Sequence, residues 1–418
     1  MDRLMTTIRP YAWGSRTAIP AMLGVEPSGE PQAELWMGAH PGAPSGVDRG
    51  AGVRSLDHVI AADPTGELGA RTVARFGPAL PFLFKVLAAQ EPLSIQVHPD
   101  LVQARAGFAA EEAAGVPLDA RERNYKDANH KPEMLCALEE FTGVCGFRSP
   151  EATARLLERL GVPTLRPLVD VLRARPEQTA LRQAMTWALT RDNGIVVKLV
   201  AATRGALLRL ADVSPTAPEA AMLRDYAALA DHHPADPGLL SALLLNHVAL
   251  VPGDALFLGP GVPHAYFRGL GVELMANSDN VLRAGLTPKH IDVPELLRVV
   301  DFRASDPVVI RPQPAVEDTG EELYPVSIDE FRLSRYRLGP ENVISLPTDT
   351  PQILLCTQGR ALLTDASGAC LTLTSGQSCF VAADGTVVHA TSLDGSGMLF
   401  RATVNLPTRT ARPRSSSR

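Results

Sequence analysis

The chain has 418 residues, of which 45% are hydrophobic, and a formal net charge of −6. A chain of this size can bury a large core in two or three domains. The negative charge argues against nucleic acid as the main partner, because no overall basic field holds phosphates. No apolar run approaches the ~18 residues of a membrane span, and the first residues, MDRLMTTIRPYAWG, lack the apolar segment of a signal peptide. Five cysteines without a CxxC pair favour a reducing compartment, so we expect a cytoplasmic protein with no membrane partner.

The first part of the chain, residues 1–148, has the texture of short β-strands. Gly and Pro separate brief apolar runs such as FLFKVL (82–87), EMLCAL (133–138) and VCGF (144–147). Runs of this length bounded by turn residues are typical of small β-barrels and sandwiches.

The stretch SIQVHPD (94–100) alternates with the period of two of a β-strand. One face is expected to hold Leu93, Ile95 and Val97. The other face is expected to hold Ser94, Gln96 and His98. A solvated strand face commonly carries Lys, Glu or Thr, so a hydroxyl, an amide and an imidazole in a row are unusual choices for it, although solubility alone could account for them.

From residue 149 the pattern becomes helical. In SPEATARLLERLG, Ser149 is suited to an N-cap, Pro150 to the first helical position and Gly161 to the end of a helix. Further helical stretches follow, and we expect an all-α inserted domain over 149–246.

The β texture returns after the helical insert and continues to the end of the chain. Residues 247–318 are expected to complete the first β domain, and 319–405 to form a second one, with hairpin-like turns at DASG and AADG. The tail 406–418 is rich in Pro, Ser and Arg, so we expect it to be disordered.

Two loops are dense in charged and polar residues without helical periodicity. One is NYKDANHKPEMLCAL (124–138) and the other runs from Pro260 to Val293. Together with the SIQVHPD strand they supply two imidazoles, a carboxylate and an amide oxygen, a set that suits zinc or another divalent metal. The candidate ligands are Gln96, His98, Glu133 and His264. Each also has a plain structural interpretation, since a histidine can be half-buried and hydrogen-bonded, Gln96 can lie on an edge strand, and Glu133 can pair with Lys131.

The chain resembles the type I phosphomannose isomerase family, a group of zinc-dependent enzymes in the cupin superfamily. The motifs that carry the resemblance are YAWGS (11–15), AELWMGAHP (33–41), SIQVHPD (94–100), YKDANHKPEM (125–134) and HAYFRGLGVELMANSDNVLRAGLTPK (264–289). The resemblance implies a mainly β fold with a helical insert. Its parts would be a catalytic cupin (jelly-roll) barrel, the all-α inserted domain and a second, metal-free cupin-like barrel, where His389 stands without a Q-x-H or H-x-H pair.

The resemblance also implies roles for individual residues. It places one Zn²⁺ per chain on the four candidate ligands named above and makes Arg283 and Lys131 the candidate catalytic residues. The candidate substrate contacts are Trp13, Glu34, Lys85, Ser94, His130, Glu273, Asp279 and Lys289. For Asp279 and for Asn280 beside it, the sequence NSDN favours turn-forming and orienting roles over acid catalysis.

The implied reaction interconverts mannose 6-phosphate and fructose 6-phosphate in a monomeric enzyme. Moving a proton between C1 and C2 through a cis-enediol(ate) requires a base and stabilisation of negative charge. Lys131 is the candidate base, and Arg283 can serve the phosphate, the enediolate or both. Two other functions remain open at this point: an Fe(II) oxygenase, which needs no basic phosphate loop, and a non-catalytic sugar sensor, which needs neither Lys131 nor Arg283.

Overall fold

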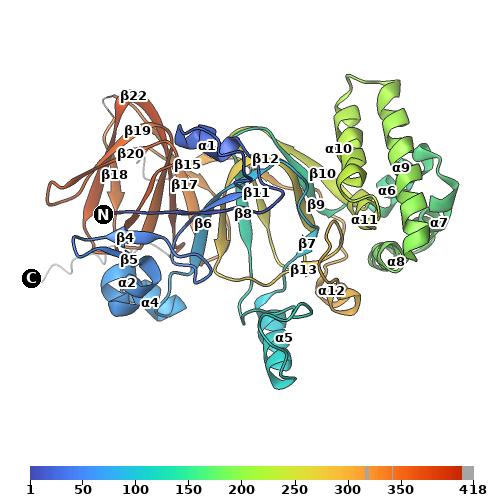
Figure 1. Ribbon diagram of the computed structural model, residues 1–418, viewed down its shortest axis with the longest axis horizontal. Helices are drawn as coiled ribbons and strands as arrows, with labels where there is room; N and C mark the ends of the chain where they lie inside the picture. The colour runs from blue at the N-terminus through green and yellow to red at the C-terminus, as the bar shows by residue number, and fades with distance from the viewer. Residues whose placement is uncertain (316–319, 341, 407–418) are drawn as a thin grey trace, which may run out of the picture. The chain divides into compact units, whose positions relative to one another are not determined.

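The computed structural model describes residues 1–315, 320–340 and 342–406, and the expected disordered tail lies, from residue 407 on, outside them. The described chain is mainly β-structure with several helices (Figure 1). It divides into two compact units. The first comprises Met1–Met5, Met37–Phe82 and the described residues from Gln313 on, and the second comprises Thr6–Trp36 and Leu83–Pro312. Within the described ranges, no helix is both long and apolar enough to cross a membrane.

The first unit is built on two long antiparallel strands, β19 (Gln352–Thr364) and β22 (Val387–Thr403). Its other strands are β1 (Asp2–Arg3), β4 (Gly46–Asp48), β5 (Val53–Ser55), β15 (Gln313–Pro314), β16 (Glu321–Tyr324), β17 (Arg332–Leu338), β18 (Ile344–Pro347), β20 (Cys370–Thr374) and β21 (Ser378–Val381). Its helices are α2 (Leu56–Ala62), α3 (Pro64–Leu68) and α4 (Ala70–Phe76). Residues of the long strands and of β17, β18, β20 and β21 form an apolar cluster, so the unit has its own hydrophobic interior.

The hairpin-like turn predicted at DASG joins β19 to β20. The Asp365 carboxylate accepts hydrogen bonds from the amides of Ser367 at 2.9 Å and Ala369 at 3.1 Å, and Gly368 has a φ of 85°. The AADG turn, with Gly385 at a φ of 72°, leads directly into β22. Both turns use glycine where the backbone enters the left-handed region.

The second unit contains a sheet in the order β14-β11-β8-β12-β6-β3-β2, and β7, β9, β10 and β13 join it off this path. The bounds of these strands are β2 (Thr7–Arg9), β3 (Glu34–Met37), β6 (Phe82–Ala89), β7 (Gln96–Val97), β8 (Glu133–Ala137), β9 (Phe141–Phe147), β10 (Leu245–Leu250), β11 (Ala255–Leu258), β12 (His264–Ala276), β13 (Leu282–Arg283) and β14 (Val309–Ile310). The start of β12 pairs with β7 and β9, and its end pairs with β8. Gly269, with a φ of 134°, lies between the two halves, where an added Cβ would be 2.5 Å from the Phe141 ring.

The helices of the second unit gather mainly in one segment of the chain, between β9 and β10. They are α6 (Pro150–Leu160), the 3-10 helix η1 (Pro163–Leu165), α7 (Arg166–Ala174), α8 (Glu177–Leu189), α9 (Asn193–Val213), α10 (Pro218–His232) and α11 (Gly238–Leu243). The predicted start and end of the first helix are confirmed. The Ser149 hydroxyl accepts a hydrogen bond from the Ala152 amide at 3.3 Å, and Gly161 follows the helix with a φ of 64°.

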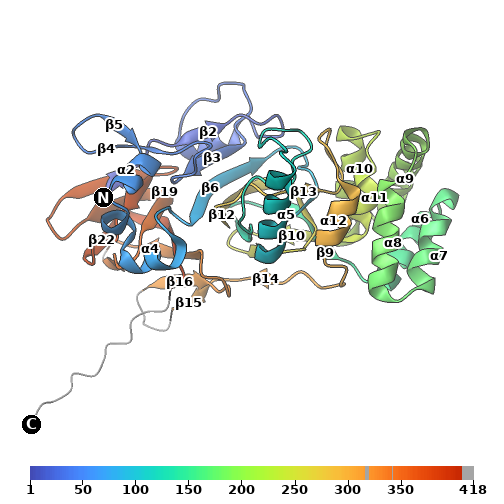
Figure 2. The same cartoon turned by 90° about the horizontal axis from the view of Figure 1, so that it is seen from below.

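Three further helices of this unit lie outside that segment, namely α1 (Ala18–Leu23), α5 (Leu101–Ala113) and α12 (Val293–Val299). Figure 2 shows α5 and α12 side by side, and the Gln103 side chain in α5 donates a hydrogen bond to the Arg298 carbonyl at 3.4 Å. A capping box at Asp100 and Gln103 starts α5 immediately after the SIQVHPD stretch. The long connection between His98 and Glu133 is therefore partly helical.

The strands around β7 separate an apolar face from a polar one. Ile95 and Val97 are fully buried in the same hydrophobic cluster as the helical segment, together with Ala265 and Leu282 from the neighbouring strands. The alternation predicted for SIQVHPD is confirmed for these two residues. For Leu93 it is wrong, because Leu93 packs in a different hydrophobic cluster and lines the cavity described below. Packing against the helices fixes which face of each strand turns toward that cavity.

A substitution in the helical core tests how strongly this packing stabilises the unit. Leu207 in α9 is fully buried in the cluster shared with Ile95 and Val97. We expect Leu207→Ala to lower the free energy of unfolding by about 2–5 kcal/mol, because a cavity replaces the side chain. Val213 at the end of α9 is 77% exposed, and Val213→Ala is the matched control with an expected change within about 0.5 kcal/mol. Urea unfolding followed by circular dichroism measures both, and equal effects would contradict this packing.

Candidate metal centre and cavity

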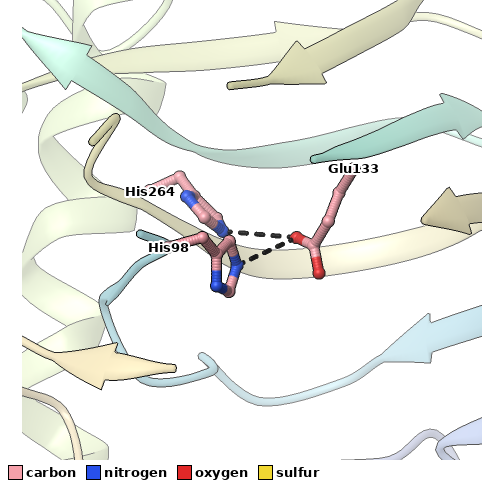
Figure 3. Close-up of side chains that lie close together, drawn as sticks. All are labelled: His98, Glu133 and His264. Atoms are coloured by element: carbon pink, nitrogen blue, oxygen red, sulfur yellow. Dashed lines mark ion pairs between the residues drawn. The ribbon is translucent and has the colours of Figure 1, made fainter. Parts of the chain in front are cut away.

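Three of the four predicted metal ligands form one buried cluster. His98 follows β7, Glu133 begins β8 and His264 begins β12. The Nε2 atoms of the two histidines lie 3.4 Å and 3.5 Å from Glu133 Oε2, and Figure 3 shows both imidazoles turned toward that carboxylate. Strand pairing brings the segments together, since Met275 of β12 is opposite Glu133 and His264 is opposite Gln96.

Backbone carbonyls fix the tautomer of each imidazole. His98 Nδ1 is 2.7 Å from the Asn280 carbonyl, and His264 Nδ1 is 2.9 Å from the Val262 carbonyl. A carbonyl oxygen can only accept, so in each ring Nδ1 carries a proton, and in the neutral imidazole Nε2 then keeps its lone pair. Two lone pairs and a carboxylate oxygen therefore converge on one buried point, which is the arrangement that a metal cation stabilises.

The dimensions of this cluster fit a tetrahedral metal ion. One ligand atom from each of the three residues lies within 4.8 Å of the others. Donor atoms about 2.0–2.2 Å from a tetrahedral metal are about 3.3–3.6 Å apart, which matches the two distances to Glu133. His98 Nε2 is buried and has no hydrogen-bond partner among the described residues. These residues thus fit a zinc ion.

The electrostatics of the cluster keep the His98 imidazole neutral and the Glu133 carboxylate ionised. Burial, helped by the charge of Lys131, lowers the pKa of His98 to about 4. For Glu133 burial alone would raise the pKa, but the positive charge of Lys131 and the interactions with His98 and His264 together outweigh it and hold the pKa well below the usual value. Lys131 Nζ contacts Glu133 Oε1, which leaves Oε2 facing the histidines.

Asn280 connects the metal cluster to the preceding loop. Its carbonyl orients His98, its side-chain Oδ1 accepts the Lys126 amide at 2.7 Å, and its Nδ2 donates to the Asp127 and Asn129 carbonyls, each at 2.8 Å. The sequence predicted an orienting role for this asparagine, and its contacts fit that role. The fully buried amide holds the loop that leads to Lys131 and Glu133.

A cavity of about 530 Å³ lies beside the cluster. It brings together most of the residues predicted for the site: Trp13, Glu34, Lys85, Ser94, Gln96, Lys131, Glu133, His264, Glu273, Arg283 and Lys289. His98 lies behind this wall with no exposed surface. His130 and Asp279 are not among the lining residues, although their backbone amides join the loop network around Asn129 and Asp127.

One side of the cavity holds a closed hydrogen-bond network. Lys85 Nζ lies 3.1 Å from Glu34 and 2.6 Å from Glu273, whose carboxylate also accepts the Tyr266 hydroxyl at 2.7 Å. The Trp36 indole N–H donates to Glu34 at 2.7 Å. Burial opposes the charge on Lys85, but the two carboxylates outweigh it and raise the pKa of the amine. Lys85 is thus held as a cation between two anions.

The cavity is also lined by two cations, Arg283 and Lys289, that have no such carboxylates. Burial alone accounts for the lowered pKa of Arg283, and burial followed by the charge of Arg283 lowers the pKa of Lys289. Within the described chain, no ion pair is found for either side chain. A half-buried guanidinium next to an amine is an environment that favours an anion.

Several lining residues were missed by sequence reasoning. They include Tyr11, Glu91, His233 and Thr287. Tyr11 stands in the YAWGS motif and stacks on Trp13 with 5.7 Å between ring centroids, so the motif could have indicated it. His233 comes directly after α10, where the local pattern predicts only the end of a helix.

Comparisons with known proteins agree with this geometry. Residues 1–150 match the family model of the phosphomannose isomerase type I catalytic domain. The chain is 41% identical over 404 residues to mannose-6-phosphate isomerase of Escherichia coli (strain K12), covering 96% of this chain and 99% of the relative. The chain belongs to the type I phosphomannose isomerase family.

The similarity extends to mammals and to solved structures. Mannose-6-phosphate isomerase of Rattus norvegicus is 32% identical, with 96% of this chain and 97% of that protein covered. A mutant phosphomannose isomerase from Salmonella typhimurium superposes with a TM-score of 0.88 at 38% identity, covering 97% of this chain and 100% of the other. A zinc-bound mannose 6-phosphate isomerase gives a TM-score of 0.86 at 37% identity, with 97% and 99% covered.

The metal cluster can be tested by removing one of its histidines. We expect the wild-type protein to bind about one divalent metal per chain and His98→Ala to lose most of it, because the buried cluster then keeps only two of its three donors. His389 in the first unit is exposed, and His389→Ala is the control that should keep the wild-type metal content. Elemental analysis of purified, folded proteins measures both, and full metal retention in His98→Ala would contradict the site.

Proposed function

We infer that the chain is a mannose-6-phosphate isomerase that interconverts mannose 6-phosphate and fructose 6-phosphate. The observation that carries this inference is the pairing, in one cavity, of a cluster that fits a metal with the unpaired cations Arg283 and Lys289. A phosphorylated sugar needs both features, one for its phosphate and one for its reacting oxygens. Relatives over the whole chain carry the name of this activity.

We propose that Gln96, His98, Glu133 and His264 hold one zinc ion. The clustering of the last three residues and the position of Gln96 in the cavity wall, opposite His264 across the strands, support this set. When bound, zinc supplies a Lewis acid that polarises substrate oxygens.

The protein side chains divide the remaining work. Arg283 and Lys289 are proposed to bind the phosphate, since nothing anionic in the described chain neutralises them. Arg283 is paired through its strand to Gln96, so its guanidinium can also stabilise negative charge that develops near the metal. The other predicted substrate contacts that line the cavity are proposed to hold the sugar. They are Trp13, Glu34, Lys85, Ser94 and Glu273. We propose His130 and Asp279 as outer contacts that shape the loop.

Lys131 is the proposed base for proton transfer between C1 and C2 through a cis-enediol(ate). It is buried, lines the cavity and contacts the outer oxygen of Glu133, so it lies directly beside the metal cluster. Lys85 is the other buried lysine in the wall, but its two carboxylates raise its pKa and keep it protonated. Lys131 contacts a single carboxylate, that of the proposed metal ligand Glu133, and this position beside the metal cluster favours it as the base.

The finer architecture is also part of this proposal. We propose that residues 1–148 and 247–318 form a catalytic cupin barrel, that 149–246 form an inserted helical domain, and that 319–405 form a second cupin-like barrel without metal. In support, β9 and β10 are antiparallel neighbours although the entire helical segment lies between them in the chain. We also propose a cytoplasmic monomer that acts on a small sugar phosphate and does not bind membranes. The net charge of −6 supports the further proposal that nucleic acid is not a partner.

The decisive test of this function is turnover of mannose 6-phosphate by the purified protein. We expect fructose 6-phosphate to form, a chelator to abolish the activity and added zinc to restore it. An oxygenase would instead consume O₂ with Fe(II), and a sugar sensor would bind without turnover. Full activity in a demonstrably metal-free sample would contradict the metal role, and absence of turnover in the zinc-loaded protein would contradict the function.

The proposed base can be tested with Lys131→Met, which keeps the apolar stem and removes the amine. We expect turnover to fall by about 10²–10⁴-fold while metal content is retained, because general base assistance is lost. Lys198→Met, at an exposed lysine of α9, is the matched control and should be fully active. In D₂O the wild-type enzyme should place some deuterium in the product. Complete retention of substrate hydrogen together with an active Lys131→Met variant would exclude proton transfer by this lysine.

A further inference from the structure

A turn at the end of the helical segment is hydrogen-bonded to the loop that carries Arg283 and Lys289. The turn contains Asp236, between α10 and α11. Its Oδ1 accepts the Leu286 amide at 2.7 Å, and its Oδ2 accepts the Thr287 amide at 3.1 Å. Oδ1 also accepts the Gly238 amide at 2.7 Å, a bond within the turn itself. One carboxylate thus links two segments about fifty residues apart.

The loop bonded to Asp236 has an unusual backbone conformation, with positive φ at two successive residues. Leu286 has a φ of 58° and is the non-glycine residue with positive φ among those the structure describes. Its neighbour Gly285 has a φ of 124°. A branched, apolar residue rarely adopts such a conformation, and it persists only where surrounding contacts enforce it. The hydrogen bond from the Leu286 amide to Asp236 is such a contact.

The two segments also touch backbone to backbone. An added Cβ on Gly285 would lie 2.4 Å from the Gly238 Cα, and one on Gly238 would lie 2.4 Å from the Leu286 nitrogen. No side chain fits between them, so the carboxylate and the two glycines fix the distance between turn and loop.

The loop is anchored at its other end to the metal strand. The Ala284 amide donates to the Ile95 carbonyl at 2.9 Å, and the Ile95 amide donates to the Gly285 carbonyl at 3.0 Å. Arg283 is opposite Gln96 in the same pairing. The two residues bonded to Asp236 follow this anchor directly in the chain. Lys289 comes two residues later, and its amide donates to the Thr287 hydroxyl at 3.1 Å.

We propose that Asp236 is a positioning residue for catalysis, which sets the distance between the cations of this loop and the metal cluster. The role of the helical segment in the reaction is then to supply a rigid platform for the phosphate-binding loop. This inference rests on the proposed function, because it concerns residues assigned there to the substrate.

The chemistry of the contact explains why a carboxylate is needed. Three amide N–H groups point at Asp236, and an ionised carboxylate accepts all of them without offering a donor. In Asp236→Asn one oxygen is replaced by an NH₂ group that faces the Thr287 amide, so one bond is lost and the others can remain. In Asp236→Ala all three amides lose their acceptor.

Steady-state kinetics on the zinc-loaded enzyme test the proposal. We expect Asp236→Ala to lower kcat/KM on the order of 10²-fold, with Asp236→Asn intermediate, because small displacements of positioned groups are costly. Zinc content should stay at the wild-type level. The matched control is Asp192→Ala, which removes a carboxylate that accepts the Gly194 amide at the start of α9 and should leave kinetics unchanged. Kinetics of Asp236→Ala within twofold of wild type, or loss of its zinc, would overturn the proposal.

A double-variant cycle separates positioning from a general loss of stability. If Asp236 acts through the loop, Asp236→Ala combined with Lys289→Met should lose little more activity than the worse single variant. Fully multiplicative losses would overturn the proposal.

Hydrogen exchange supplies a readout that needs no activity. Amides of residues 283–289 should exchange faster in Asp236→Ala than in the wild type and in Asp192→Ala, and unchanged exchange would overturn the proposal. A wild-type protein that fails to isomerise mannose 6-phosphate would refute the proposed function, whereas these exchange rates would still report whether Asp236 holds the loop.

Discussion

The site depends on three segments that hold two imidazoles and one carboxylate around a buried point. Each imidazole gives its Nδ1 proton to a backbone carbonyl, so both Nε2 lone pairs face Glu133 Oε2. Such a set of donors is unfavourable without a cation, and the surrounding structure has to oppose its rearrangement. That requirement explains the buried Asn280, whose amide ties the loop before Glu133 to the segment that orients His98.

The helical segment also helps to hold the metal-cluster residues in place, through its packing against β7. Its core includes Ile95 and Val97, so the packing that stabilises the helices also fixes the face of β7 that carries Gln96. A slip of one residue would exchange polar and apolar faces and bury Gln96 in the helical core. The helices lie between β9 and β10 in the chain, although these strands are direct neighbours in the sheet. Their packing therefore stabilises the register of the strands at the site.

Patterns within a few neighbouring residues predicted the features that depend only on those residues, such as strand alternation and helix ends. The period of two in SIQVHPD indicated the polar face, and Ser149 and Gly161 marked both ends of α6, as observed. The missed features depend on contacts between distant segments. Nothing near His233 indicates that the end of α10 reaches the cavity, and nothing near Leu286 indicates a positive φ, because the stabilising carboxylate is Asp236, far away in the chain. Leu93 was misplaced for a related reason, since it packs in a cluster with residues from distant strands such as Leu135 and Phe141 and not with Ile95 and Val97.

Three lysines in one cavity show how environment separates the roles of identical side chains. Lys85 lies between Glu34 and Glu273 and is held as a cation that orders the wall. Lys131 shares Glu133 with the metal cluster, so a cation bound there would compete with it for the carboxylate. Lys289 is exposed, and its charged neighbour in the loop is Arg283. An acidic chain can therefore bind an anionic sugar, because the carboxylates of the wall neutralise Lys85 and leave the loop cations for the substrate.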